Sequence, residues 1–395
     1  MRDIRSLRPT FFAIAFFFLF IGRLIAMSPM VIDLGSYGFK GISSGERFKG
    51  FPEHPLSLFV GDDRVVLITK VKELPKGLES HERPDSWRLH YRAIVISLVS
   101  GTVTSEADLG GAGADSDADV LSDGTIVLYH PGFLEFWKLR SDGSLAKEKT
   151  VGVDVHEIDQ AAAEMHQAFG GGFSPSFSHD SVYLIVRAYR SKLSKVWRIT
   201  STSVKPIDVH LLPLSIDQAV ESDIAIFGKA AEGVKCDIYL IPFGLRRPTS
   251  KIYTNDCKNV GKPTFIGPDE IVFGGEHPEF TTASGDVISH PEMKNAGTIT
   301  ADWNGSAYMA SRYGMSGGND FFDIGAHLSK VFITVFDKQW HERCHLVMRM
   351  RGADLSGPYL SPKGDRIIAY DDGRFYAWDV NELASGPKGK THGGQ

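Results

Sequence analysis

Apolar and polar positions alternate in short segments along most of the chain, which is typical of β-strands rather than helices. One unit recurs: a short strand, a tight polar turn, and a second strand rich in β-branched and aromatic residues. Clear copies start at Val60, Val120, Phe177, Phe265 and Leu360, and weaker copies start at Val220 and Ala301. Their turns lie about 50 residues apart, close to the length of a four-stranded propeller blade with extra loop.

A second alternating segment follows the repeated unit at most of these places. It occupies residues 133–139, 195–199, 236–241 and 374–380 and carries aromatic residues in most copies. Polar turns that contain glycine, such as Arg140–Gly143, then lead toward a fourth strand. The pattern therefore predicts a four-stranded unit repeated along the chain.

Three short stretches resemble the repeats of WD40-like and TolB-like β-propellers, whose blades carry a Pro-x-Phe/Trp-Ser-Pro-Asp-Gly motif. Pro175–Asp180 and Pro358–Gly364 match this motif, and Trp378–Asp379 matches the WD dipeptide. The Gly-His element of WD40 repeats is missing. The resemblance extends unevenly over residues 56–380 and implies a fold rather than a function.

The fold prediction is an all-β chain forming a single β-propeller, with seven four-stranded blades rather than six or eight. The alternative is two packed β-sandwiches, which share short strands and turn signals. The last repeat ends at Val380 after its third strand, so we expect Met30–Leu34 to complete the last blade and leave no open edge. The predicted organisation is an export segment over 1–26, the propeller over 27–380 and a flexible polar tail over 381–395.

The N-terminal segment has the order of a secretory signal. Arginines at positions 2, 5 and 8 precede Phe11–Gly22, an apolar run of 12 residues. This run is too short to span a bilayer core of about 30 Å. Cleavage near Ala26 is one outcome; the other is a signal anchor that stays attached, because Arg23 and Leu24 make a poor A-x-A cleavage site. Either way, we expect an exported chain, secreted or periplasmic, that meets a membrane only through this segment.

Charge indicates which partners the chain can bind, and the cysteine content indicates whether it can form a disulfide. Lys plus Arg total 43 against 48 Asp plus Glu, which leaves no basic surplus for nucleic acid. An exported chain can oxidise its cysteines. Pairing Ile241 with Ile252 in a hairpin would place Cys236 opposite Cys257, so these two are predicted to form a disulfide, with Cys344 left as a free thiol.

His341-Glu-Arg-Cys-His345 is a literal H-E-x-x-H, the zinc-protease motif, in which one helical turn brings both histidines to one metal. The flanking residues alternate with a period of two, which predicts a strand. On a strand the two histidines stand about 13 Å apart, too far for one zinc ion. We therefore expect no metal here.

Other chemical motifs are weak. Asp115–Asp119 offers three carboxylates for Ca²⁺ but lacks the glycine and glutamate of an EF-hand, so a solvated loop is favoured. Asn304–Ser306 is a glycosylation sequon that also suits a plain turn. The chain has no G-x-S-x-G, phosphate loop or dinucleotide motif, so no cofactor and no catalytic residue are assigned.

Three long connections predict where a ligand binds. Residues 73–91 and 313–329 are expected second-to-third-strand loops, and Asp154–Phe169 is an expected helix in the link from blade two to blade three. In four-stranded antiparallel blades these connections emerge on one face, and long loops often carry binding residues. The predicted ligand-binding residues on this face are Trp87, His156, His166, Tyr313, Asn319, Asp320, Phe321 and Phe322.

Taken together, the sequence predicts an exported, non-catalytic propeller that acts as a binding or scaffold module for a protein, peptide or glycan. The rival from another class is a propeller hydrolase or lyase with a metal on the axis, its ligands drawn from several blades. A third possibility, a TolB-like component of an envelope complex, rests on analogy of fold alone.

Overall fold

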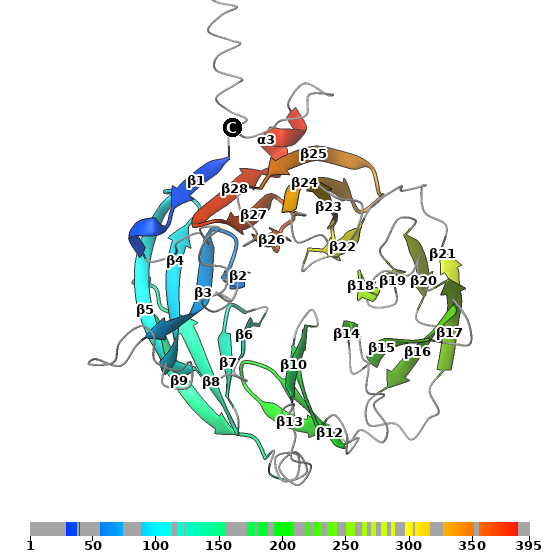
Figure 1. Cartoon of the computed structure of the whole chain (residues 1–395), viewed down its shortest axis with the longest axis horizontal. Coiled ribbons are helices and arrows are strands. Elements are labelled where there is room, and N and C mark those ends of the chain that lie inside the picture. The colour runs from blue at the N-terminus through cyan, green and yellow to red at the C-terminus, as the bar shows by residue number, and fades with distance from the viewer. Residues whose placement is uncertain are drawn as a thin grey trace, which may run out of the picture.

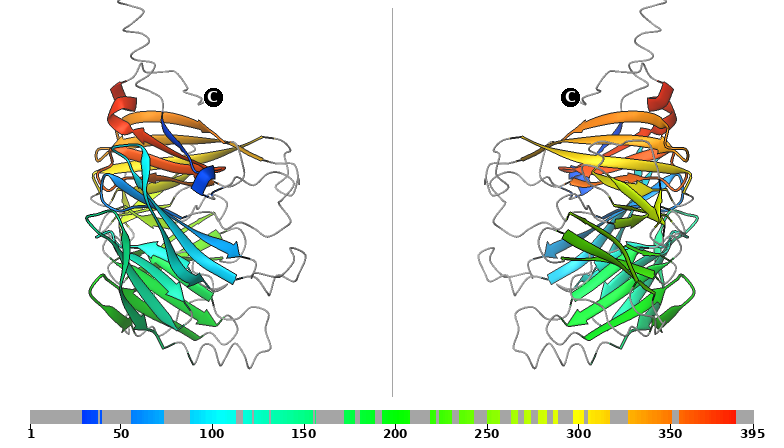
Figure 2. Two further views of the ribbon diagram at one scale, coloured as in Figure 1. Left: turned by 90° about the vertical axis from the view of Figure 1, so that its left-hand side faces the viewer. Right: turned by 90° about the vertical axis from the view of Figure 1, so that its right-hand side faces the viewer.

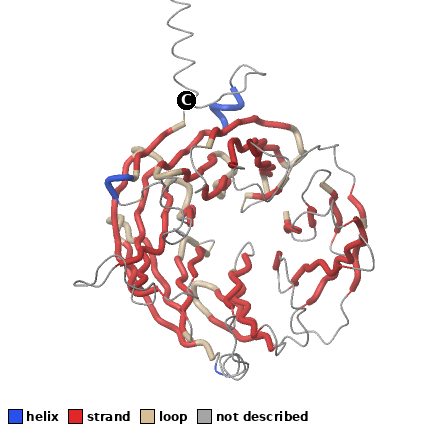
Figure 3. Tube along the Cα trace, viewed as in Figure 1, coloured by secondary structure: helices blue, strands red, loops and turns tan. Residues whose placement is uncertain are grey.

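Most of the residues that the structure describes lie in strands (Figure 3). The computed structural model describes residues 29–37, 39, 56–73, 88–112, 117–121, 123–130, 132–154, 156, 172–177, 181–188, 193–207, 219–221, 224–230, 235–242, 250–256, 263–266, 270–273, 278–282, 286–288, 297–302, 305–316, 327–350 and 355–385.

These strands form seven antiparallel sheets of four strands each, arranged in a ring (Figure 1). Sheet one contains β2 (Leu56–Phe59), β3 (Arg64–Glu73), β4 (Arg88–Ser97) and β5 (Thr102–Ala112). Sheet two contains β6 (Asp117–Val120), β7 (Ile126–His130), β8 (Phe133–Leu139) and β9 (Leu145–Gly152). Sheet three contains β10 (Gly172–Phe177), β11 (Val182–Ala188), β12 (Leu193–Ile199) and β13 (Val204–Ile207).

The remaining sheets follow the same order along the chain. Sheet four contains β14 (Ala219–Glu221), β15 (Ile224–Ala230), β16 (Lys235–Pro242) and β17 (Ser250–Asp256). Sheet five contains β18 (Pro263–Phe265), β19 (Glu270–Phe273), β20 (Glu279–Thr282) and β21 (Val287–Ile288). Sheet six contains β22 (Thr298–Ala301), β23 (Ala307–Ser316), β24 (His327–Asp337) and β25 (Glu342–Arg349). Sheet seven contains β26 (Leu355–Leu360), β27 (Arg366–Asp371), β28 (Arg374–Asp379) and, from the other end of the chain, β1 (Met30–Asp33).

The first strand of each sheet is the innermost. β2 contacts both β6 and β26, and contacts continue from β6 to β10, β14, β18 and β22, so the inner strands surround the axis of the ring (Figure 1). The fold is thus an all-β, propeller-like ring of radially arranged sheets.

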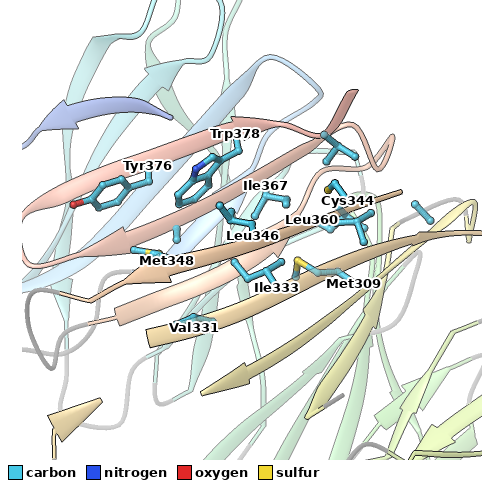
Figure 4. Packing of buried hydrophobic residues seen from close by; sticks show 14 residues of the cluster. Met309, Val331, Ile333, Cys344, Leu346, Met348, Leu360, Ile367, Tyr376 and Trp378 are labelled. Atoms are coloured by element: carbon cyan, nitrogen blue, oxygen red, sulfur yellow. The ribbon is translucent and has the colours of Figure 1, made fainter. Parts of the chain in front are cut away.

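Apolar side chains fill the space between neighbouring sheets. The second strand of a sheet is covered on both faces, and β7 is accordingly buried at every residue, whereas β8 alternates and β9 is mostly polar. Figure 4 shows the cluster between sheets six and seven, in which Ile333 and Leu346 pack against Ile367 and Trp378. The sequence pattern of apolar inner strands and polar outer strands follows from this arrangement.

The N-terminal strand pairs with the last sheet, as predicted. β1 lies antiparallel to β28, with Met30 opposite Ala377 and Asp33 opposite Arg374. Ile32 and Leu34 point between sheets seven and one, where both are buried. The short helix η2 (Gly35–Tyr37) follows β1.

The two ends of the ring differ. Turns between first and second strands and between third and fourth strands emerge on one end, the turn face, and are closed by bonds such as Leu121 N–H to the Thr125 carbonyl. Connections between second and third strands and links between sheets emerge on the other end, the crossover face (Figure 2). These two faces follow from strand direction in an antiparallel sheet.

Glycine is required where turn-face loops pack on the preceding sheet. Gly364 has φ +67°, and a Cβ there would lie 2.5 Å from the Ala307 Cβ of sheet six. Gly124 has φ +80°, and its Cβ would lie 2.9 Å from a Val60 methyl of sheet one. The Asp-Gly and Lys-Gly signals in the repeat therefore reflect close contact between sheets as well as turn geometry.

The register predicted for the cysteine hairpin is wrong. Cys236 on β16 lies opposite Asn255 on β17, two residues from the predicted partner, and a bulge between Ile238 and Tyr239 shifts the pairing. The in-register argument for a Cys236–Cys257 disulfide therefore fails, and Cys257 itself lies outside the described residues. Cys344 is a free, buried thiol.

The first part of the predicted flexible tail is helical. Its first residues belong to α3 (Val380–Ser385), which begins because the Asp379 carboxylate accepts the backbone N–H groups of Asn381 at 2.8 Å and Glu382 at 3.1 Å. The aspartate of the WD dipeptide is thus a helix cap. The expected export segment over 1–26 and nearly all of the expected helix over 154–169 lie outside the described residues, and no helix within them is long and apolar enough to cross a membrane.

Candidate binding face

Strand direction brings the ends of the predicted insertions to the crossover face. β3 ends and β4 begins there at Glu73 and Arg88, and β23 ends and β24 begins there at Ser316 and His327 (Figure 2). The link from sheet two to sheet three leaves β9 on the same face. The anchoring strands of all three connections therefore point the same way.

Both hairpin connections are shorter than predicted. Glu73 and residues 88–91 lie in strands, as do residues 313–316 and 327–329. Tyr313 is therefore a strand residue opposite Val331 rather than a loop residue.

Of the other predicted ligand-binding residues, only His156 is described. It is exposed, and its backbone N–H donates to the Asp154 carboxylate at 3.2 Å. Asp154 is held against sheet three by Lys195, whose Nζ lies 3.2 Å from the Asp154 carbonyl oxygen. Trp87, His166, Asn319, Asp320, Phe321 and Phe322 lie outside the described residues.

Two tyrosines converge on Gly357 where sheets six and seven meet. The Tyr313 hydroxyl donates to the Gly357 carbonyl oxygen at 3.0 Å, which fixes a ring that is 43% exposed. Gly357 has φ +99°, and a Cβ there would lie 3.1 Å from the ring of Tyr359, which is 36% exposed. Because β26 is an innermost strand, Tyr359 borders the axis. We call Tyr313 and Tyr359 the tyrosine pair.

Neutral hydroxyl groups lie beside this pair. The Tyr359 hydroxyl is 3.5 Å from the Ser356 Oγ, which in turn lies 3.3 Å from the Ser57 Oγ of sheet one. Burial and the neighbouring Tyr359 raise the pKa of Tyr313, so its hydroxyl stays protonated and keeps its donor role at physiological pH. The pair thus offers aromatic surface together with the neutral, donating hydroxyl of Tyr313.

A second aromatic group lies on the crossover face of sheet two. Phe133 is 37% exposed, and its ring stacks on the buried His130 ring with centroids 4.4 Å apart. Glu135 lies below, 3.9 Å from His130 Nε2, and accepts hydrogen bonds from Lys147 at 2.9 Å and Trp137 at 3.2 Å. Burial lowers the pKa of His130, although Glu135 partly opposes this effect.

Sequence reasoning missed Tyr359 and Phe133 because both lie in segments interpreted as blade framework. Tyr359 follows the proline of the propeller-like motif, and Phe133 starts a predicted third strand. The only available signal was a large aromatic residue next to a connection between strands.

Residues 342–345 of the H-E-x-x-H segment lie in strand β25, as predicted. His341 precedes β25 and lies on the turn face, where its Nδ1 is 3.2 Å from the Asp337 carboxylate. The Nδ1 of His345 is 3.1 Å from the Thr334 hydroxyl on the neighbouring strand. The two histidines thus have separate partners.

The remaining weak motifs have local roles where they are described. Within the sequon, the Ser306 hydroxyl donates to the Asp302 carboxylate at 2.6 Å and so forms part of the turn. The first part of the aspartate-rich stretch lies outside the described residues, and Asp117 and Asp119 belong to β6. Across the described ranges, no three His, Cys, Asp or Glu side chains are grouped so as to hold a metal ion.

No protein-family model matches the chain, and no curated protein matches its sequence. Among solved structures, it is similar to the Dos1 propeller (9% identity, TM-score 0.40), covering 87% of this chain and 97% of that one. It is also similar to oligogalacturonate lyase from Vibrio parahaemolyticus (10%, TM-score 0.44), covering 83% and 98%. A third is puromycin hydrolase (9%, TM-score 0.44), covering 84% and 52%. These similarities concern the fold alone.

Proposed function

We propose that this chain is an exported, non-catalytic seven-bladed propeller that binds a protein, peptide or glycan on its crossover face. The observation that carries the proposal is the tyrosine pair. Exposed aromatic side chains on a rigid scaffold offer large contact area at low cost in side-chain entropy, which is why tyrosine is frequent in binding surfaces.

The arrangement of the pair suits binding better than catalysis. The hydrogen bond from Tyr313 to Gly357 and the close approach of Tyr359 to Gly357 hold both rings in place before any ligand arrives. Preorganised rings lose little freedom on binding. The described hydrogen-bond partners of the pair are the Gly357 carbonyl oxygen and the Ser356 hydroxyl.

The described ends of three long connections lie on the crossover face. The anchoring ends of β3 and β4, of β23 and β24, and of the link after β9 all point to the crossover face. Binding residues are frequent on loops that a rigid scaffold positions, so these connections are further candidates for ligand contacts.

The test measures binding of the parent chain and of two variants, Tyr359→Ala and Val99→Ala, to a glycan array, a peptide array and an envelope extract. Tyr359→Ala removes one ring of the pair, while Val99→Ala removes a 76%-exposed apolar side chain from the opposite, turn face. We expect Tyr359→Ala to lower the affinity for any ligand found by ten-fold or more, and Val99→Ala to leave that affinity unchanged. Equal affinity of all three chains contradicts the proposal, and stoichiometric metal with hydrolase or lyase activity favours the rival enzyme.

A further inference from the structure

Both chain ends leave the ring on the turn face, opposite the crossover face. β28 runs from the Asp372–Gly373 turn toward the turn face, where α3 follows it. β1 is antiparallel to β28, so its first residue lies at the turn-face end. The contact of Met30 with the β4–β5 turn agrees, because a Cβ on Gly101 would lie 3.4 Å from the Met30 sulfur.

The apolar export segment ends close to this point. Only four positions separate Ala26 from Met30, and an extended chain of that length reaches about 14 Å at most. Any membrane insertion of the segment would therefore hold the turn face near the bilayer. The crossover face would then point away from it.

The segment has the length to remain inserted when its C-terminal flank is included. Thr10–Met27 contains one charged residue, Arg23, close to its end. A helix of that length extends about 27 Å, near the thickness of a bilayer core, and an arginine near a helix end can extend its side chain to the interface. The poor cleavage site around Arg23 and Leu24 favours retention.

We infer that the export segment is retained as a signal anchor and that the ring stands on the membrane with its turn face toward the bilayer. Tyr313 and the described ends of the long connections on the crossover face are then presented to the outer compartment. The inference rests on the exported state in the proposed function but not on any ligand, so failure to find a ligand leaves it intact.

The charges of the turn face are compatible with this orientation. Asp62 and Asp63 lie there beside Lys363, whose ammonium pairs with Asp62 across sheets one and seven. A mildly acidic face does not adhere to anionic lipids, but electrostatic repulsion decays over about 8 Å at physiological salt. The chain from Ala26 to Met30 can extend beyond this distance. It can therefore orient the ring without adhesion of the turn face to the lipid surface.

The first test is mass spectrometry of the full chain from the membrane fraction of an expressing bacterium. We expect a peptide that includes residues before Ala26, and flotation of the protein with vesicles of phosphatidylethanolamine and phosphatidylglycerol. A mature N-terminus at residue 27 overturns the inference. The matched control, a chain without residues 1–26, should not float.

The second test measures orientation by energy transfer to a rhodamine-labelled lipid in the same vesicles. A donor dye is attached at Ser100→Cys, in the turn beside Met30, or at Asp154→Cys on the crossover face, with Cys236 and Cys257 replaced by Ser. We expect transfer efficiency from position 100 to be at least twice that from position 154, with both variants melting within about 2 °C of their parent. Equal or reversed efficiencies contradict the orientation.

Discussion

β1 packs into the ring through the buried side chains of Ile32 and Leu34. Truncating Leu34 tests ring closure by β1 directly. Leu34 is fully buried between sheets seven and one, packed with Val65 and Leu67 of β3 and Phe375 of β28. Its backbone N–H donates to the Gly373 carbonyl at 2.8 Å, a bond that side-chain truncation leaves in place. Leu34→Ala therefore isolates the packing contribution of the N-terminal strand.

The expected loss of stability follows from the complete burial of the Leu34 side chain. Replacing a fully buried leucine by alanine lowers the free energy of unfolding by 2–5 kcal/mol in well-packed cores, so about 3 kcal/mol is expected. Unfolding entropy near 2.1 cal/mol/K per residue gives about 0.7 kcal/mol/K for a folded region of about 350 residues. The melting temperature should then fall by about 4 °C.

Val31 is the matched control, because it lies on the same strand with its side chain on the opposite side and is 48% exposed. Val31→Ala should change the free energy of unfolding by less than about 0.5 kcal/mol. The assay is guanidinium unfolding followed by tryptophan fluorescence, with calorimetry for the melting temperature. If Leu34→Ala costs no more than Val31→Ala, the N-terminal strand does not close the ring.

Two further predictions concern titratable groups. Burial lowers the folded-state pKa of His130 below its unfolded value, so the unfolded chain binds the additional proton and stability is lost as pH falls through the unfolded and then the folded pKa. Urea unfolding should therefore show a smaller loss of stability from pH 7 to pH 5 in His130→Phe than in the parent, and parallel pH profiles would refute this. Burial raises the pKa of Cys344 to about 11, so this thiol should resist iodoacetamide at pH 8 in the folded chain and react after unfolding. Peptide mass spectrometry separates it from Cys236 and Cys257, and rapid modification in the folded state would contradict its burial.

The strand framework could be predicted because each local signal reports a local cause. The Asp-Gly turn at residues 123–124 marks the junction of β6 and β7, since the Asp123 carboxylate accepts the Thr125 N–H at 3.0 Å and Gly124 adopts a positive φ. Apolar and polar residues alternate with a period of two around His345, which correctly predicted a strand. A strand does not have the helical geometry that the zinc motif requires. Pairing of β1 with β28 followed from counting strands in the last repeat.

Register and side-chain burial could not be predicted in the same way. Leu240 pairs with Ser250 and Cys236 with Asn255, so the register is offset from the predicted one along the whole hairpin, and nothing in the alternation signals this offset or the bulge between Ile238 and Tyr239. His130 is buried because sheet one brings Tyr91 within 6.0 Å of its ring, a contact between segments that sequence periodicity does not report. The tyrosine pair likewise arises where β23 meets β26 of another sheet.

The pairing of β1 with β28 determines when the ring closes during folding. Met30 and Ala377 are separated by nearly the whole folded region, and joining them in an unfolded chain of that length costs about 5 kcal/mol of loop entropy. The four residue pairs of β1 with β28 cannot offset this cost before the intervening sheets have folded and brought their two ends together. Closure is therefore expected to be the last step of folding, after the intervening sheets have formed. An attached anchor would hold β1 at the membrane during that time, so the final sheet would form beside the bilayer, with the turn face already oriented toward it.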